Sequence, residues 1–269
     1  MFEVTYRYDP AHPLDGRTPR DPEEARRLLE AGNQAFASMD TGSASQSRVV
    51  YVGPEDVGLA APGGLASQQP FAVVLGCCDA RVPTEMIFDR ACNELFVVRV
   101  AGNIVSQELL GSIAYAVEHL GESLKLVVVL GHSRCGAVTA AVDAYLEPAC
   151  YLGFSASHHV RSIVNILFPA VSGAARTLSA GRGDEVEKMP GYRAALVECS
   201  VAINAALTAS ILRSELGDPA GARASSSGST TSPPAGFRSR CRPRKVANRA
   251  PAWRTPRTRA RSADCSPPR

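Results

Sequence analysis

The sequence of 269 residues contains no apolar run near the length of about 20 residues that a membrane-spanning helix needs. Its start lacks a basic segment followed by an apolar one, so we expect no secretory signal peptide. It has no C-x-x-C pair, and its eight cysteines are too scattered for a disulfide framework. These absences favour a cytoplasmic protein with reduced thiols and without a membrane partner.

Charge divides the chain into two parts. Residues 218–269 carry twelve basic and two acidic side chains, a net charge of +10, whereas residues 1–217 carry seventeen basic and twenty-four acidic ones, a net charge of −7. We predict a globular domain over 1–217 and a basic tail rich in Ser, Pro and Arg over 218–269, disordered because it cannot bury a core. No aromatic platform or recognised module accompanies its arginines, so no nucleic-acid partner is expected.

Short apolar runs alternate with segments of helical periodicity. The apolar runs at 71–75, 95–100 and 124–130 predict buried strands, and the segments 21–36, 106–120 and 192–216 predict helices. This alternation predicts an α/β fold with a mostly parallel central sheet flanked by helices. In such sheets ligands bind beyond the carboxyl ends of the strands.

Two of these strand ends carry chemically active side chains, in "CCDAR" (77–81) and "GHSRC" (131–135). If the strands are close, Cys77 can meet His132 and Cys135. Two thiolates and an imidazole suit zinc, and three protein ligands leave a fourth position open, as in catalytic sites. From the residues alone an alternative stands: the cysteines could be small buried hydrophobes and the histidine a turn residue, because H-x-x-C is short and common.

The motifs "CCDARVPTE", "VVRVAGNIV", "SIAYAVEHLG" and "LVVVLGHSRCGAV", in this order, resemble signatures of the β-class carbonic anhydrases. The resemblance covers roughly residues 22 to 216, which would form the family's catalytic domain. It implies one Zn²⁺ per subunit, held by Cys77, His132 and Cys135. It also implies a catalytic dyad of Asp79 and Arg81.

The same resemblance implies reversible hydration of carbon dioxide to bicarbonate and a proton, through attack by zinc-bound hydroxide. Asp79 would orient the hydroxide while paired with Arg81 and, once released, could become an alternate fourth zinc ligand. Gly102, in "AGN", is expected to lie near the substrate, and a homodimer or higher oligomer is expected. Two alternatives remain: a catalytically impaired zinc-binding homologue, and a hydrolase of carbon disulfide or carbonyl sulfide acting at the same site.

The chain departs from the family pattern after Leu216. Where the family continues into a last strand, this sequence turns to Ser, Pro and Arg, so we expect that strand to be lost. Codons can be chosen from Ala224 onward that encode, in another reading frame, a segment resembling the missing strand. The tail is therefore interpreted as a possible frameshift product, which the nucleotide sequence around codon 220 would test.

Overall fold

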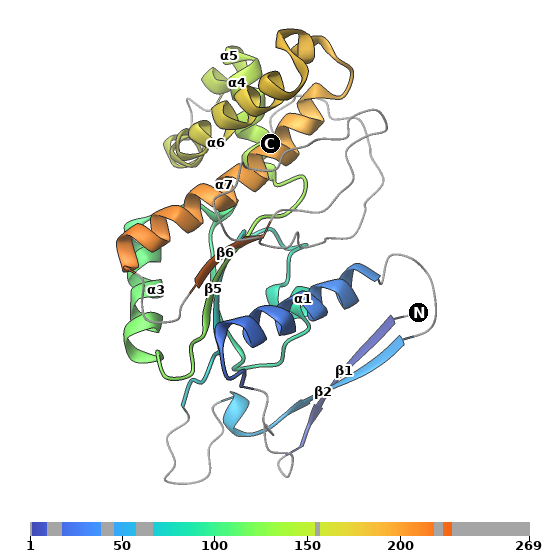
Figure 1. The fold of residues 1–269 in the computed structure, drawn as a ribbon, viewed down its shortest axis with the longest axis vertical. Helices are drawn as coiled ribbons and strands as arrows, with labels where there is room; N and C mark the ends of the chain where they lie inside the picture. Colours follow the sequence, from blue (N-terminus) through green and yellow to red (C-terminus); the bar gives the residue numbers. More distant parts are fainter. Residues whose placement is uncertain are drawn as a thin grey trace.

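The computed structural model describes residues 2–9, 18–38, 46–57, 67–153, 157–217 and 223–227 (Figure 1). The strands are β1 (Phe2–Tyr8), β2 (Gln46–Val52), β3 (Ala72–Gly76), β4 (Leu95–Arg99), β5 (Leu126–Leu130) and β6 (Arg223–Ser227). The α-helices are α1 (Pro22–Ser38), α2 (Thr84–Phe88), α3 (Gln107–His119), α4 (Gly136–Leu146), α5 (Pro148–Gly153), α6 (His158–Arg182) and α7 (Tyr192–Leu216). Short 3-10 helices are η2 (Glu55–Val57), η3 (Ala101–Asn103) and η5 (Asp184–Lys188).

A four-stranded parallel sheet in the order β4-β3-β5-β6 forms the centre of the molecule. Strands β3 and β5 are buried along their whole length, as their unbroken apolar sequences predict. The predicted α/β class, with a parallel sheet flanked by helices, is therefore confirmed. The register pairs Gly76 with both Arg99 and Leu130, so three strands end at one edge. The loops that follow them start side by side.

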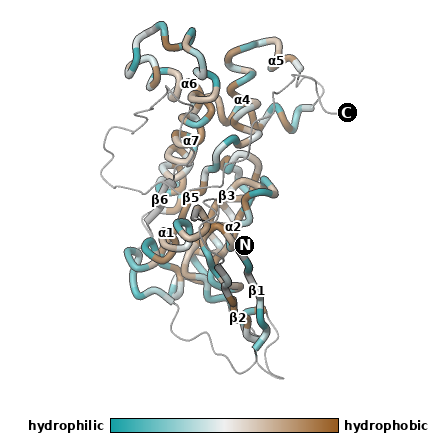
Figure 2. The backbone as a smooth tube through the Cα atoms, turned by 90° about the vertical axis from the view of Figure 1, so that its right-hand side faces the viewer, coloured by the Kyte–Doolittle hydropathy of each residue, from teal (hydrophilic) through white to brown (hydrophobic). Residues whose placement is uncertain are grey.

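Helices cover both faces of this sheet because successive side chains of a strand point to opposite faces. On one face, Val74 and Val128 belong to a core that includes apolar residues of α1 and α2. On the other, Val73 and Val127 belong to a core formed with α3 and the second half of α7. Figure 2 colours β3 and β5 as hydrophobic at the centre of the molecule. Covered on both sides, these strands form a fixed base for the loops at their ends.

Helices α4, α6 and α7 form a further core, which also contains Cys77 and Cys135. By length and composition alone, α6 and α7 could cross a membrane. This is weak evidence, because core helices of soluble proteins pass the same test; 61% of the most apolar window of α7 and 39% of that of α6 are buried inside the protein. The absence of a membrane partner stays a prediction.

The last strand is a correction to the sequence-based expectation. We expected the strand after α7 to be lost, but β6 pairs in parallel with β5, from Leu126 opposite Arg223 to Leu130 opposite Ser227. A strand edge is completed by backbone hydrogen bonds, which do not require apolar side chains. Five residues of the predicted disordered tail thus belong to the sheet. Residues 218–222 and 228–269, the rest of the predicted tail, lie outside the described residues, and the frameshift stays a hypothesis.

The pair β1–β2 was not predicted. Residues Phe2 to Tyr8 lie in register with Gln46 to Val52 as a separate two-stranded parallel sheet. By composition residues 40–48, which are small and polar, favour a loop, but the structure places Gln46 to Arg48 in β2. The alternation of Phe2, Val4 and Tyr6 with polar residues was the available signal, although the partner strand lies about forty residues away.

Candidate metal centre

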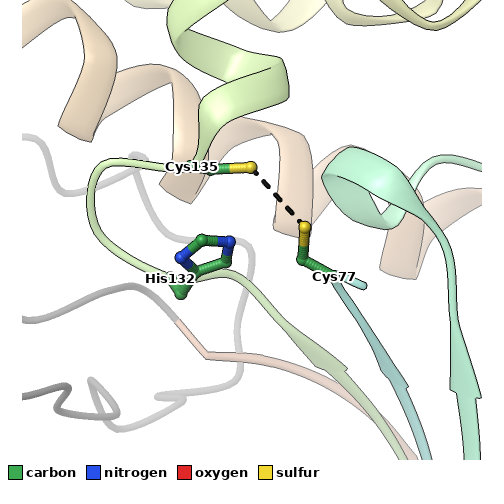
Figure 3. A group of neighbouring side chains, drawn as sticks. All are labelled: Cys77, His132 and Cys135. Atoms are coloured by element: carbon green, nitrogen blue, oxygen red, sulfur yellow. Dashed lines mark hydrogen bonds between the residues drawn. The ribbon is translucent and has the colours of Figure 1, made fainter. Parts of the chain in front are cut away.

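Three side chains converge at the carboxyl edge of the sheet (Figure 3). Cys77 directly follows β3, while His132 and Cys135 lie in the turn after the neighbouring strand β5. One possible ligand atom from each residue lies within 4.8 Å of the other two, and all three residues are buried. The structure thus brings the three predicted ligands together. Their role as ligands stays a prediction.

The turn between β5 and α4 places two of these residues. Arg134 adopts a positive φ of 52°, which reverses the chain tightly, and its backbone N–H donates to Glu198 of α7 at 3.1 Å. Cys135 then occupies the N-cap position of α4. The positive end of a helix dipole favours an ionised thiol at this position.

The two thiols share a hydrogen bond, with their sulfur atoms 3.9 Å apart. This bond lowers the pKa of Cys77 from 9.0 to about 4, against the opposing effect of burial, and the Gly102 N–H contributes further. The pKa of Cys135 is raised, because its proton is shared with Cys77 and because it is buried. One thiol of the pair therefore ionises readily, while the other keeps the proton that they share. A bound cation would favour the thiolate form of both.

His132 is oriented for coordination through Nε2. Its Nδ1 lies 3.1 Å from the backbone oxygen of Ser133, a contact that suits an N–H donor at Nδ1 and leaves the lone pair on Nε2. His132 is 2% exposed, and Nε2 has no hydrogen-bond partner among the described residues. A buried acceptor without a donor is costly unless something else satisfies it. With two thiol sulfurs close by, a zinc ion fits this donor set.

Asp79 and Arg81 form a bidentate ion pair beside the thiols. Arg81 donates from Nε to Oδ1 at 3.0 Å and from Nη2 to Oδ2 at 2.6 Å, and its backbone N–H donates to Oδ1 at 2.9 Å. The side-chain hydrogen bond from Arg81 is the main reason why the pKa of Asp79 falls to about 2. Asp79 Oδ2 lies 4.0 Å from His132 Nε2. The carboxylate therefore borders the three-residue group, and each of its two oxygens accepts a hydrogen bond from the Arg81 guanidinium.

Arg99 is a site residue that sequence reasoning missed. It donates from Nε to the backbone oxygen of Cys77 at 2.8 Å and from Nη2 to that of Asp79. One guanidinium thus braces the loop on both sides of Cys78, whose own thiol is exposed. The available signal was a charged residue at the carboxyl end of an otherwise apolar strand, in the motif "VVRVAGN".

Gly102 lies next to the candidate metal site. Its backbone N–H donates to Cys77 Sγ at 3.3 Å, and its φ of 68° is one that glycine adopts readily. The expected contact with substrate is not tested by this geometry. Instead, the structure places Gly102 as a hydrogen-bond donor to a predicted ligand.

Comparison with known proteins identifies related sequences. A family model described as carbonic anhydrase matches residues 72–214, a range that contains all the residues of the site. Carbonic anhydrase 2 of Mycobacterium tuberculosis is 36% identical over 191 residues, covering 71% of this chain and 81% of the relative. A carbonic anhydrase of Mycolicibacterium smegmatis is 43% identical over 121 residues, covering 45% of this chain and 55% of the relative.

Solved structures with a similar fold include a β-carbonic anhydrase of Aspergillus fumigatus, 21% identical, with a TM-score of 0.42 over 60% of this chain and 72% of that one. One of two β-carbonic anhydrases of Sordaria macrospora, described as tetrameric, is 20% identical, with a TM-score of 0.38 over 60% of this chain and 76% of that one. Structural similarity at this level does not assign a family. The family model and the sequence relatives assign it.

Proposed function

Because this chain belongs to the β-class carbonic anhydrase family, we propose that it hydrates carbon dioxide reversibly to bicarbonate and a proton, with one zinc ion held by Cys77, His132 and Cys135. The observation that carries the proposal is the convergence of these three buried side chains, with a His132 Nε2 atom that has no hydrogen-bond donor among the described residues. Two sulfurs and one imidazole nitrogen form a zinc ligand set that leaves one tetrahedral position open to solvent or substrate.

Zinc, when bound, would lower the pKa of a coordinated water and so supply a nucleophile at neutral pH. The Asp79 carboxylate, ionised because its pKa is near 2, can accept a hydrogen bond from the attacking water and orient its lone pair. Arg81 holds both carboxylate oxygens and so fixes that orientation. The water oxygen bonds to the carbon of carbon dioxide, and the released proton leaves to solvent.

The proposal is tested by measuring carbon dioxide hydration in a stopped-flow instrument with protein whose zinc content is known. We expect about one zinc per chain, loss of activity after removal of the metal with a chelator, and recovery when zinc is restored. Zinc-loaded protein without activity would overturn the proposal in favour of an impaired zinc-binding homologue. Hydrolysis of carbon disulfide or carbonyl sulfide without carbon dioxide hydration would favour the sulfur-substrate alternative.

Replacing Arg81 with Leu is expected to lower the hydration rate by about 10- to 100-fold, the usual cost of losing a group that orients a metal site. Asp79 would lose its bidentate partner, and its pKa would rise toward the ordinary value. Zinc content should not change, because the hydrogen bonds that Arg81 makes within the described part of the chain go to Asp79 and not to a ligand atom. Rate and metal content are measured on the same samples, with Arg81→Lys as a variant that keeps the charge but loses the bidentate geometry. Loss of zinc from Arg81→Leu would contradict the dyad role.

A homodimer or higher oligomer in the cytoplasm is part of the proposal. Ile166 of α6 and Leu207 and Ile211 of α7 are 41% to 46% exposed in the single chain, and a second copy could cover them. A reducing compartment would keep the thiols of Cys77 and Cys135 available for metal. Light scattering would measure the mass in solution. A fully active monomer would exclude assembly as a requirement.

A further inference from the structure

The turn η3 lies between the candidate metal site and helix α7. On one side, the Gly102 N–H donates to Cys77 Sγ at 3.3 Å. On the other side, two buried side chains of α7 bind the backbone oxygens of the same turn. Asn204 donates from Nδ2 to the Gly102 oxygen at 2.8 Å, and Thr208 donates from Oγ1 to the Asn103 oxygen at 3.3 Å. The turn therefore connects a predicted metal ligand to a helix about 100 residues further along the chain.

The conformation of this turn needs external support. Gly102 has a φ of 68°, and Asn103 follows with a φ of 42°, so two consecutive residues lie in the left-handed region. For a residue other than glycine, such a conformation costs on the order of 1 kcal/mol or more. A Cβ on residue 102 would lie 3.1 Å from Ala137 Cβ and 3.2 Å from Leu167 Cδ1, so the turn also has little room to move. Its geometry is set by its neighbours rather than by its own preference.

The polar groups on α7 are placed for this task. Asn204 is 5% exposed and Thr208 is 3% exposed, one helical turn apart, beside the apolar residues Ala205 and Ala209. Burying an amide costs free energy unless its groups are hydrogen-bonded, and the donor of Asn204 is satisfied by the Gly102 oxygen. With the peptide on one side of Gly102 held, the N–H on its other side keeps its direction toward the sulfur.

We propose that Asn204 is a positioning residue for the metal centre, which acts by fixing the turn that donates the Gly102 N–H to the Cys77 sulfur. The inference rests on the proposed zinc site. A hydrogen bond to a ligand sulfur holds its lone pairs in place and draws electron density from it, so the metal receives less. Loss of the bond leaves a more electron-rich and less well oriented sulfur.

The test uses cobalt in place of zinc, because the sulfur-to-cobalt charge-transfer absorption reports the electronic state of the thiolates directly. In Asn204→Ala we expect this absorption to move to longer wavelength, because the sulfur is more electron-rich. The zinc affinity, measured by chelator competition, should fall about tenfold, because the loss of ligand orientation outweighs the stronger donation. Asn204→Ser keeps a hydroxyl that is too short to reach the Gly102 oxygen, so it should show the same changes. It provides a second test if Asn204→Ala does not fold.

Ser200→Ala is the matched control. Ser200 lies one turn earlier on α7, is fully buried, and its hydroxyl has no hydrogen-bond partner among the described residues. Its replacement should leave the cobalt spectrum and zinc affinity unchanged. If the Asn204 variants lose stability but keep the wild-type spectrum and affinity, Asn204 is merely structural and the inference is wrong. If the wild-type protein itself shows no thiolate-to-cobalt absorption, the zinc site fails, and the inference fails with it.

Discussion

The variant Cys135→Ser is expected to lose its zinc and to hydrate carbon dioxide more than about a thousandfold more slowly than the wild-type protein, because the metal supplies the nucleophile. Serine is close to cysteine in size, but its hydroxyl does not ionise readily and binds zinc poorly. Only Cys77 and His132 would remain as ligands, fewer than the three protein ligands that catalytic zinc sites use. Zinc content and stopped-flow rates, measured together, test this expectation.

Cys78→Ser is the matched control for this variant. The Cys78 thiol is exposed, whereas Cys77 and Cys135 are buried with their sulfurs 3.9 Å apart. The same chemical change at the neighbouring position should leave both zinc content and rate at wild-type levels. Stoichiometric zinc in Cys135→Ser, or loss of zinc in Cys78→Ser, would show that the metal is held by a different set of residues.

The second large effect is on stability. Gly32→Ala is expected to lower the free energy of unfolding by about 3 kcal/mol or more, at the upper end of what overpacking costs. A Cβ on residue 32 of α1 would lie 1.7 Å from the backbone oxygen of Phe88 and 2.4 Å from its carbonyl carbon. These are backbone atoms at the end of α2, so they cannot rotate away as a side chain could. Helices α1 and α2 would have to separate, which exposes their shared core.

Gly111→Ala in α3 is the control, since it introduces the same methyl group into another helix. Apart from the nearby backbone of α3 itself, no atom of the described residues lies within 4 Å of the Cβ position at Gly111, which is exposed. There the better helix propensity of alanine should raise the free energy of unfolding by about 0.5–1 kcal/mol. Urea unfolding of both variants measures the two effects. If the two variants changed the free energy of unfolding by equally small amounts, α1 and α2 would not be packed as closely as the structure has them.

Much of the fold was predictable because its signals are local. The apolar runs at 71–75 and 124–130 became β3 and β5, and the segment 192–216 became α7. Asp21 accepts hydrogen bonds from the backbone N–H groups of Glu23 and Glu24, as expected of an N-cap. In a parallel sheet the carboxyl ends of the strands lie at the same edge. For that reason Cys77 and the "GHSRC" turn could be expected to converge before any distance was known.

Other features were not predictable, because they join distant segments through single contacts. Arg99 reaches back to the backbone of Cys77, and Asn204 reaches from α7 to Gly102. Each is one polar residue in an apolar element, and the sequence does not say which carbonyl it will meet. The pairing of β1 with β2 and of β6 with β5 likewise depends on which strand edge lies within reach once the rest has packed.

The amino-acid order alone determined where β3, β4, β5 and the helices α1, α3 and α7 form and which thiols and imidazole stand at the strand ends, since these follow from patterns within short segments. Only the tertiary structure decided how those groups are held. It brings the Arg99 guanidinium back to the Cys77 carbonyl, and it directs the Gly102 N–H at the Cys77 sulfur through Asn204 of a helix near the far end of the domain. The orientation of a hydrogen bond depends on the relative position of whole elements. Packing sets that position, and no short stretch of residues specifies it.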